Sequence, residues 1–595
     1  MKIVFINVCD YVNIASSSYP LGILSLATVI KESGEYEVEV IDFNRIYTEQ
    51  GVDISDDLNE NIMNDTNYIL KYNPDFVSLY TMCNSHHIAI LLAKQIKSQN
   101  PKVKVLFGGP HASLTAEATL KKFDFIDAIG IGEGENTILE ILRAVNSSDF
   151  TDVRGIGYRQ NGEILCIDND NLISDMDQMP IIDFDLYKHN LDKGISLDVG
   201  RGCPFGCSFC STKTFWKRKF RIKSAVRIFH EITTYIEKYD VYEFNFQHDL
   251  FLVNRNVVLE LCDMIIQNNI KISWYCSSRI DTIDEEMINK MYLAGCKSIF
   301  FGIETGSERM QKLINKNLNL GSLDNLVTLL KKYNITPTFS FIYGFPDETE
   351  KDIDETLSIL YYLYSYFYED FKGRNITLNL SKLIFFPGTE ITNRYIDELH
   401  YIGNYHTDAR LSIGRWNSEI LNKLIRDKQI FPQYFDLPTK LRNELRNLDI
   451  VFNCIFIHTI MYINETYRLV LDSMNNSNLK VYYAFTEVVS ESEILNCHIY
   501  NYNNLKEYIL DVMKLIKRFV NTYEFGENTE AIRNIFAFEE NIFLFSTINN
   551  DYEEVVEYDY DVISMKKNRL INPIRNNIKV KFLKSDNSAS VYKVK

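Results

Sequence analysis

The sequence predicts an α/β protein made of three successive regions. Short apolar runs alternate with helical stretches from the first residue to about residue 145. The same alternation resumes near residue 196, and a mostly helical α+β pattern follows residue 400. Strands separated by helices of this length indicate parallel crossovers. At 595 residues the chain is too long for one hydrophobic core, which agrees with several domains.

The first region, residues 1–145, is expected to fold as a doubly wound parallel sheet. Its expected elements are strands at 2–7, 36–43, 75–80 and 104–107, a helix from Pro20 to Gly34, and a helix at 88–97. In such sheets ligands bind beyond the carboxyl ends of the strands. The loops there include two glycine-rich turns, 108–111 and 130–135, where the backbone can approach a ligand closely.

Residues 146–189 are expected to form a polar linker. Within it, residues 155–164 predict a hairpin, because Asn161-Gly162 is a strong signal for a two-residue turn.

Three cysteines, Cys203, Cys207 and Cys210, have the spacing C-x3-C-x2-C. A four-iron cluster normally takes four thiolate ligands, so a compact loop with three would leave one iron open to a substrate or cofactor. Zinc with a distant fourth ligand is an alternative, although zinc sites usually show paired C-x2-C motifs. Ordinary buried thiols are a second alternative, but the spacing fits no packed face of a helix or strand.

The second region, residues 190–400, contains six expected strands. They are 196–199, 242–246, 272–276, 297–301, 338–342 and 378–386, and nearly every one ends in a turn that carries a candidate binding residue. The cysteine loop follows the first strand. Arg279 follows the third, where its planar guanidinium suits a carboxylate.

The cysteine loop resembles the cluster motif of the radical S-adenosylmethionine (SAM) superfamily. The resemblance implies a partial (β/α)6 barrel, a 4Fe-4S cluster on the three cysteines, and SAM bound to the open iron. It places Phe209 near the adenine, His248 or Asp249 at the methionyl amine, and Arg279 at the carboxylate. It also places Glu304 at the ribose, and Ile342 and Gly344 in a turn on the adenine side.

The first region resembles the cobalamin-binding domain that precedes the radical core in one branch of this superfamily. The similarity lies in residues 17–22, 108–111 and 132–135. It implies cobalamin contacts at Ser78, Gly108, Gly109, His111, Gly132, Glu133 and Gly134. The D-x-H-x-x-G motif that supplies an axial histidine in many cobalamin proteins is absent. Members of this branch often lack it, and a degenerate sheet kept for docking or for another nucleotide is the alternative.

The net charge, the lengths of the apolar runs and the cysteine content exclude several classes of protein. The net charge of -17 argues against broad binding of nucleic acid, which depends on clustered Lys and Arg. No uninterrupted apolar run reaches the ~18 residues of a membrane span, and the start of the chain does not resemble a signal peptide. Eleven cysteines, eight of them scattered, indicate a reducing compartment and thus a cytoplasmic protein.

The third region, residues 401–595, carries less information. Helical periodicity covers 441–471 and 505–520, and strand-like runs occur at 481–485 and 578–583. We expect a mostly helical domain that covers the barrel opening, selects the substrate and excludes water from radical chemistry.

These features predict a cobalamin-dependent radical SAM enzyme that methylates an unactivated carbon of a peptide or natural product. The substrate would be a peptide or small molecule, and a flavodoxin or ferredoxin would supply electrons. One alternative is a radical enzyme that cyclises, rearranges or desaturates its substrate without methyl transfer. Another is a non-catalytic cobalamin or redox sensor, and a methylthiotransferase of transfer RNA fits less well. The sequence singles out no catalytic acid or base.

Overall fold

The structure is a computed structural model that describes most of the chain. The described residues are 1–11, 19–49, 51–170, 172–191, 194–368, 376–402, 419–460, 462–497, 505–547, 552–560, 562, 563, 565, 575–585 and 588–594. Of the sequence stretch 17–22, positions 17 and 18 lie outside these residues. By its contacts the chain divides into two compact units, which are residues 1–303, 311–339 and 383–439, and residues 304–310, 340–382 and 440–595.

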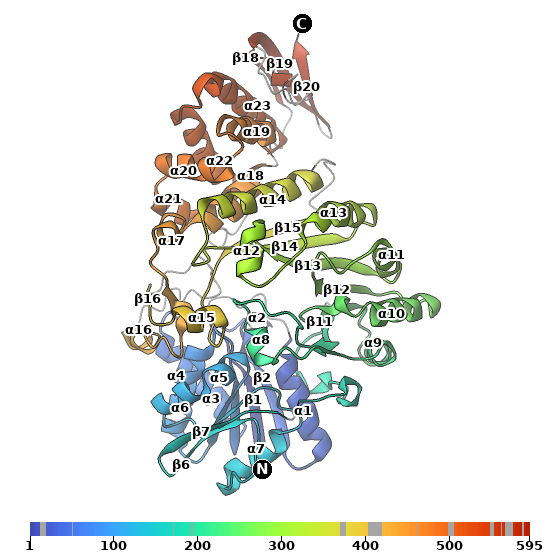
Figure 1. The fold of residues 1–595 in the computed structure, drawn as a ribbon, viewed down its shortest axis with the longest axis vertical. Coiled ribbons are helices and arrows are strands. Elements are labelled where there is room, and N and C mark those ends of the chain that lie inside the picture. Colours follow the sequence, from blue (N-terminus) through green and yellow to red (C-terminus); the bar gives the residue numbers. More distant parts are fainter. Residues whose placement is uncertain are drawn as a thin grey trace. The chain divides into compact units, whose positions relative to one another are not determined.

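A seven-stranded sheet in the order β2-β1-β3-β4-β5-β6-β7 forms the beginning of the first unit (Figure 1). Its parallel strands are β1 (Lys2–Asn7), β2 (Glu37–Asp42), β3 (Phe76–Tyr80), β4 (Lys104–Gly108) and β5 (Ala128–Gly130). The connecting helices are α1 (Leu21–Ser33), α2 (Phe43–Glu49), α3 (Leu58–Leu70), α4 (His86–Gln99), α5 (Pro110–Leu114), α6 (Ala116–Lys122) and α7 (Ile138–Ser147). The order 2-1-3-4-5 is that of a doubly wound fold, so the predicted sheet is confirmed.

The hairpin predicted in the linker forms, and it extends this first sheet. Its strands are β6 (Ile156–Gln160) and β7 (Glu163–Ile167), and β6 pairs antiparallel with β5. The Arg159 guanidinium anchors the hairpin, because it donates to the backbone carbonyls of Leu120, Phe123 and Ile126.

A second sheet has the order β15-β14-β13-β12-β11-β8 and supplies the predicted six barrel strands. They are β8 (Ile195–Asp198), β11 (Glu243–Gln247), β12 (Ser273–Ser278), β13 (Cys296–Glu304), β14 (Thr336–Tyr343) and β15 (Thr377–Lys382). The helices between them include α9 (Ala225–Tyr239), α10 (Arg255–Gln267), α11 (Glu285–Leu293), α12 (Glu308–Leu313), α13 (Leu323–Lys332) and α14 (Glu350–Tyr368). The strands β8, β11, β12 and β13 run parallel.

Burial alternates along the barrel strands. On β11 and β12, Phe244, Phe246, Trp274 and Cys276 are buried, whereas the residues between them remain half-buried or exposed. Successive side chains of a strand point to opposite faces. One face of the sheet is therefore a packed core, and the other is left accessible.

The chain beyond residue 440 is mostly helical, as predicted. Its helices are α17 (Lys440–Glu444), α18 (Ile457–Ile460), α19 (Asn464–Ser473), α20 (Asn478–Val488), α21 (Glu491–Asn496), α22 (Leu505–Thr522) and α23 (Thr529–Thr547), with a π-helical turn over Ile450–Phe456. Strands β18 (Tyr552–Tyr560), β19 (Arg575–Ser585) and β20 (Ser588–Val594) form an antiparallel sheet, and β19 contains the predicted strand 578–583.

The strand predicted at 481–485 is wrong, because these residues lie inside α20. The Ser477 hydroxyl caps this helix by accepting from the backbone N–H of Lys480 at 3.2 Å. Buried Leu479, Tyr482 and Phe485 recur at helical spacing. A five-residue apolar run does not distinguish a strand from a buried helix.

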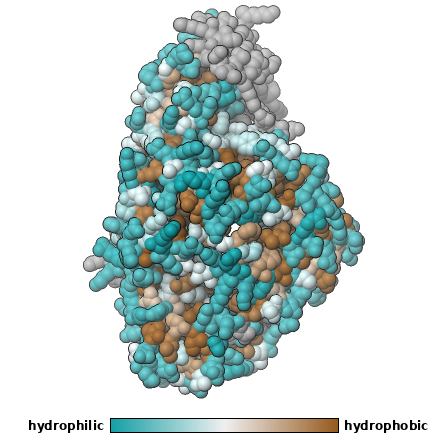
Figure 2. All heavy atoms as spheres, viewed as in Figure 1, coloured by the Kyte–Doolittle hydropathy of each residue, from teal (hydrophilic) through white to brown (hydrophobic). Residues whose placement is uncertain are grey.

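Hydrophilic side chains cover much of the face shown in Figure 2, with apolar patches between them. Across the described part of the chain, we find no helix with the length and apolar character needed to cross a membrane.

Candidate functional site

The three cysteines lie in a loop that its neighbours hold at several points. The loop follows β9 (Gly200–Arg201) and precedes α8 (Thr212–Phe215). The backbone N–H of Ser208 donates to Ile314 O at 2.9 Å, and Ser208 O accepts from the N–H of Ile391 at 3.0 Å. The Asn315 amide donates to Gly206 O at 2.9 Å. These bonds fix the backbone, so the positions of the cysteines are largely set before any ligand binds.

The cysteine side chains fit an iron–sulfur cluster. All three are half-buried and none forms a disulfide. Burial, together with the nearby charges of Asp249, Cys210 and Cys207, raises the pKa of Cys203 to about 11. Bound iron would offset this cost, because a coordinating thiol is deprotonated outright. Among the described residues, no group of three or more His, Cys, Asp or Glu side chains is arranged to hold a single metal ion.

Phe209 lies within the cysteine loop, and Asp249 lies beside it. Phe209 is half-buried within the loop itself. The Thr212 hydroxyl donates to the Asp249 carboxylate at 3.3 Å. Asp249 is therefore placed where a charged group of a ligand at the loop could meet it.

The structure gives His248 a role within the chain. Its Nδ1 accepts from the backbone N–H of Leu250 at 2.8 Å, and its Nε2 lies 3.2 Å from Arg221 O. Burial lowers the pKa of His248 to about 4. Because both ring nitrogens have partners, Asp249 is the better of the two candidates for the methionyl amine.

Arg279 is likewise occupied by the chain. Its guanidinium binds Asp281 through Nε at 2.9 Å and Nη2 at 2.8 Å, and Nη1 donates to Lys316 O at 3.0 Å. It also lies 4.0 Å from the centroid of the Phe205 ring, inside the cysteine loop. Arg279, the residue predicted to bind the SAM carboxylate, thus contacts both the cysteine loop at Phe205 and the neighbouring segment at Lys316.

Three predicted SAM contacts, Glu304, Ile342 and Gly344, belong to the second unit. Glu304 ends β13 with a positive φ of 67° and is buried. Gly344 also has a positive φ, 84°, and its N–H donates to Glu348 Oε2. Burial raises the pKa of Glu348 to about 8. The turn after β14 is therefore held by a buried carboxyl group that sequence reasoning did not single out.

The predicted cobalamin contacts gather at the carboxyl ends of the first sheet's strands. Gly108 ends β4, and Gly109 has φ +95°, where an added Cβ would lie 2.7 Å from Thr81 O. Ser78 lies half-buried within β3. Gly109 is thus required by the close approach of two backbone segments as well as by its conformation.

His111 is part of a buried histidine cluster with His86 and His87. Its Nε2 lies 2.8 Å from Ile430 O, and its ring centroid lies 4.4 Å from that of His86. Burial lowers the pKa of His111 to about 4 and that of His87 to about 3. The Nδ1 atoms of all three rings are buried without a hydrogen-bond partner. Such an orphaned acceptor on His111 fits the amide side chains of a corrin ring, which donate hydrogen bonds.

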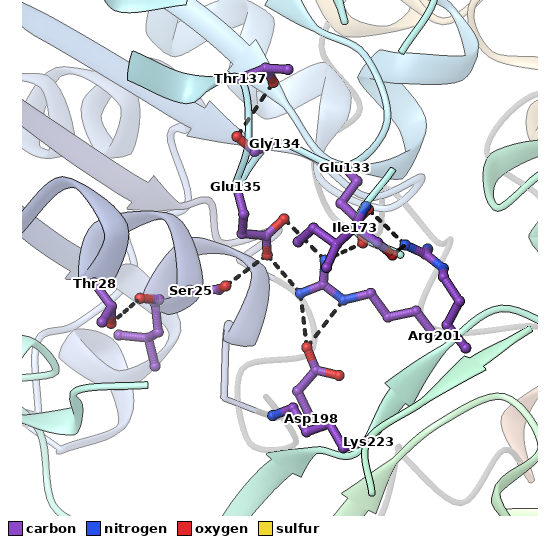
Figure 3. A network of polar contacts seen from close by, with 12 residues as sticks. Ser25, Thr28, Glu133, Gly134, Glu135, Thr137, Ile173, Asp198, Arg201 and Lys223 are labelled. Atoms are coloured by element: carbon purple, nitrogen blue, oxygen red, sulfur yellow. Dashed lines mark hydrogen bonds and ion pairs between the residues drawn. The ribbon is translucent and has the colours of Figure 1, made fainter. Parts of the chain in front are cut away.

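The turn of Gly132, Glu133 and Gly134 holds a charge network that the sequence did not reveal (Figure 3). Glu133 accepts from Arg201 and Arg221, and Glu135 accepts from Arg201 and from the Ser25 hydroxyl. Although burial opposes it, the charge of Arg201 lowers the pKa of Glu135 to about 2. Arg201 directly precedes Gly202 and Cys203, so the turn predicted to bind cobalamin contacts the start of the cysteine loop, called its root below.

Sequence comparison identifies two domains at these sites. Residues 9–142 match the B12 binding domain, and residues 197–360 match the radical SAM superfamily. The chain combines a B12-binding domain with a radical SAM domain. This radical SAM enzyme therefore uses a 4Fe-4S cluster, SAM and cobalamin, as the sequence predicts.

Relatives of the radical SAM enzyme carry different activities in their names. An uncharacterized methyltransferase of Pyrococcus horikoshii is 28% identical over 70% of this chain and 88% of its own length. An anaerobic magnesium-protoporphyrin IX monomethyl ester cyclase of Rubrivivax gelatinosus is 27% identical over 58% of this chain and 62% of its own. A cytidylyl-2-hydroxyethylphosphonate methyltransferase of Streptomyces wedmorensis is 26% identical over 55% and 69%.

Two solved structures share the fold of the radical SAM enzyme. The cobalamin-dependent SAM radical enzyme OxsB with aqua-cobalamin bound gives a TM-score of 0.59 over 92% of this chain and 81% of its own, at 15% identity. The SAM methyltransferase TsrM of Kitasatospora setae, with cobalamin and a 4Fe-4S cluster bound, gives 0.54 over 68% and 78%, at 14% identity. Both confirm the predicted fold class.

Proposed function

We propose that this enzyme methylates an unactivated carbon of a peptide or natural-product substrate. The observation that carries the proposal is the contact between the Glu133–Glu135 turn of the B12-binding domain and Arg201 at the root of the cysteine loop. A methyl donor on one domain and a radical source on the other must act on the same carbon, which requires that they lie close together. Two of the relatives described above are named as methyltransferases, which supports the same reaction.

When bound, SAM on the reduced cluster supplies a 5'-deoxyadenosyl radical and methylcobalamin supplies the methyl group. The chain's own residues bind and orient. We propose that Cys203, Cys207 and Cys210 hold the cluster, and that Phe209, Asp249, Glu304, Ile342 and Gly344 are SAM-binding residues. We propose Ser78, Gly108, Gly109, His111, Gly132 and Gly134 as the cobalamin contacts.

The accessible face of the barrel strands suits a neutral substrate. Asn245, Tyr275, Ser277 and Phe300 are half-buried or exposed there, between buried neighbours, and Glu243 at the start of β11 is paired with the Tyr275 hydroxyl. Uncharged hydrogen-bonding groups and aromatic rings would orient such a substrate without binding it as an ion. We place the protein in the cytoplasm, with a flavodoxin or ferredoxin as its reductant and no nucleic acid partner.

A second candidate is ring closure or rearrangement without methyl transfer, which the cyclase name of one relative favours. Product analysis separates the two. Reduced, reconstituted protein is incubated with SAM, cobalamin and candidate substrates. S-Adenosylhomocysteine together with 5'-deoxyadenosine and a methylated product supports methyl transfer. Formation of 5'-deoxyadenosine alone supports the cyclase, and a variant with all three cysteines changed to Ala is the blank.

A further inference from the structure

Two arginines lie directly opposite each other beside the cysteine loop. Strand β9 pairs antiparallel with β10 (Arg221–Ile222), and Arg201 is the register partner of Arg221. Like charges at directly opposed positions destabilise a ladder. Both guanidinium groups are at least nine-tenths buried, with side-chain exposures of 10% and 9%. Such an arrangement requires carboxylates from elsewhere in the chain.

Glu133 supplies the bridging carboxylate. Its Oε1 accepts from Arg201 Nη1 at 2.7 Å, and its Oε2 accepts from Arg221 Nη1 at 2.8 Å and from the backbone N–H of Ile173 at 2.8 Å. Its side chain is 1% exposed. A buried carboxylate with both oxygens engaged is held in one orientation.

Arg201 is held equally firmly. Besides Glu133 it binds Glu135 at 2.6 Å and Asp198 at 2.8 Å, so Nε, Nη1 and Nη2 all have acceptors. Its guanidinium also lies 5.7 Å from the Trp216 ring centroid. Three carboxylates thus surround one arginine, two from the turn after β5 and one from the end of β8.

Because Arg201 lies two residues before Cys203, the position of Arg201 constrains that of the first cysteine. Only Gly202 separates Arg201 from Cys203, and Gly202 has φ +84° with a site for Cβ that lies 2.1 Å from Lys219 O. The backbone of Gly202 therefore has little room to change its dihedral angles when Arg201 moves, so a movement of Arg201 would also move Cys203.

We propose that Glu133 and Arg201 are positioning residues that fix the cysteine loop against the cobalamin-binding turn. That the cysteine loop binds the cluster and the 132–135 turn binds cobalamin rests on the proposed function. The link between the two segments through Glu133 and Arg201 does not depend on it. Loss of the Glu133 charge should loosen the loop while its cysteines remain intact. Glu133 is then a residue that orients the cluster site from the other domain, with both of its carboxylate oxygens bound by other groups of the chain.

The chain offers a matched control in a second buried ion pair. Glu231 of α9 binds Lys223 Nζ at 2.8 and 2.9 Å, and both side chains are 2% exposed. This pair follows β10 directly, and the bonds of the Glu231 carboxylate go to Lys223 and Arg227 rather than to the turn at 132–135. Glu231→Gln therefore removes a charge of the same burial without touching the link.

Hydrogen–deuterium exchange of the 202–211 backbone amides tests the proposal in the full-length protein. We expect exchange to be about fivefold or more faster in Glu133→Gln than in the wild type, and near the wild-type rate in Glu231→Gln. Glu135→Gln should act in the same direction, and it provides the comparison if Glu133→Gln does not fold. Equal protection of the loop in these variants and in Glu231→Gln would overturn the proposal.

A second readout follows the cofactors without measuring turnover. In protein loaded with cob(II)alamin and a reduced cluster, the cluster should speed the spin relaxation of the cobalt signal. We expect that enhancement to weaken in Glu133→Gln and to persist in Glu231→Gln, and its persistence in both variants would count against the proposal. If the wild type binds no cobalamin, the proposed function fails, but the exchange comparison still decides whether the link exists.

Discussion

Gly202 is the residue on which the cysteine loop depends most directly. A non-glycine residue at its φ of +84° is strained, and a Cβ there would lie 2.1 Å from Lys219 O. We expect Gly202→Ala to cost about 1–3 kcal/mol in backbone strain alone and to lose most of its iron. Iron and sulfide per chain after anaerobic reconstitution measure this.

Gly206 provides the control for that substitution. Its φ is not in the left-handed region, and a Cβ there would lie 3.2 Å from the Asn315 amide nitrogen, which needs to move by only a few tenths of an ångström and can keep its bond to Gly206 O. Gly206→Ala should keep most of the cluster. Equal iron content in the two variants would show that the conformation of Gly202 does not hold the loop.

The buried histidines predict an acid-labile first unit. The folded-state pKa of His111, about 4, lies below its value of about 6.5 in an unfolded chain. Its stabilising contribution is therefore present above pH 6.5 and is lost as the pH falls toward 4, by about 1.4 kcal/mol for each pH unit. His87 acts in the same direction, and its folded-state pKa is about 3.

Guanidinium unfolding at pH 7.5 and pH 5.5 checks this prediction. His111→Gln should lose less stability between the two pH values than the wild type. His230→Gln should match the wild type, because His230 lies exposed on α9. The same loss of stability in all three proteins would contradict a neutral, buried His111.

Sequence reasoning found the positions of the site residues better than their partners. Arg279 and His248 follow barrel strands as predicted. However, Arg279 binds Asp281, and the two ring nitrogens of His248 bind backbone groups of Leu250 and Arg221. Glu133 lies in the predicted turn, but its bond to Arg201 spans 68 residues of sequence. Charged residues in two separate loops carry no signal that they meet, so Arg201, Arg221 and Asp198 were missed. An arginine adjoining the cysteine motif was the one available hint.

At the scale of elements, the segment between α12 and α13 supports the cysteine loop. Arg279 holds this segment at Lys316 O, and Ile314 and Asn315 in turn bind the loop. Arg279→Lys keeps the charge but cannot reproduce the fork to Asp281. We expect it to cost about 2 kcal/mol and to speed the loss of iron to a chelator.

Arg255→Lys is the matched control for Arg279→Lys. Arg255 also binds carboxylates through its fork, those of Asp284 and Glu286, but it does so at the exposed surface. Its replacement should leave the rate of iron loss unchanged. If the two variants lose iron equally fast, the segment does not support the loop through Arg279.

Long elements were more predictable than short ones. The alternation of strands and helices predicted both parallel sheets, because the strands are short apolar or alternating runs between turn signals. The short run at 481–485 was assigned to a strand and is helical, since its packing partners decide its conformation. The hairpin at 155–164 was predicted from Asn161-Gly162, but its pairing with β5 depends on contacts that local sequence does not encode.

At the scale of the whole molecule, the last barrel strands fold with the C-terminal helices. Asn453 bonds to both backbone groups of Leu380 in β15, at 2.9 and 2.6 Å. The Tyr343 hydroxyl of β14 donates to Asp449 at 3.0 Å, and the N–H of Leu479 donates to Asp354 of α14 at 3.0 Å. The second unit is thus built from three stretches of the sequence, residues 304–310, 340–382 and 440–595.

This interleaving predicts that truncation will damage the barrel itself. A chain ending at residue 439 would leave Tyr343, Asp354 and Leu380 without Asp449, Leu479 and Asn453, and it would uncover Tyr361, whose ring centroid lies 5.2 Å from that of Tyr467. Burial of one large apolar side chain stabilises a fold by about 1.5–3 kcal/mol. We expect this chain to aggregate and to hold no cluster. Of the described strands, a chain ending at residue 547 lacks β18, β19 and β20, which pack against α23 through contacts such as Phe538 with Tyr558, so it should remain monodisperse and keep its iron. Size-exclusion chromatography with iron analysis compares the two, and a soluble, iron-loaded 1–439 chain would show that the radical core folds without its C-terminal partner.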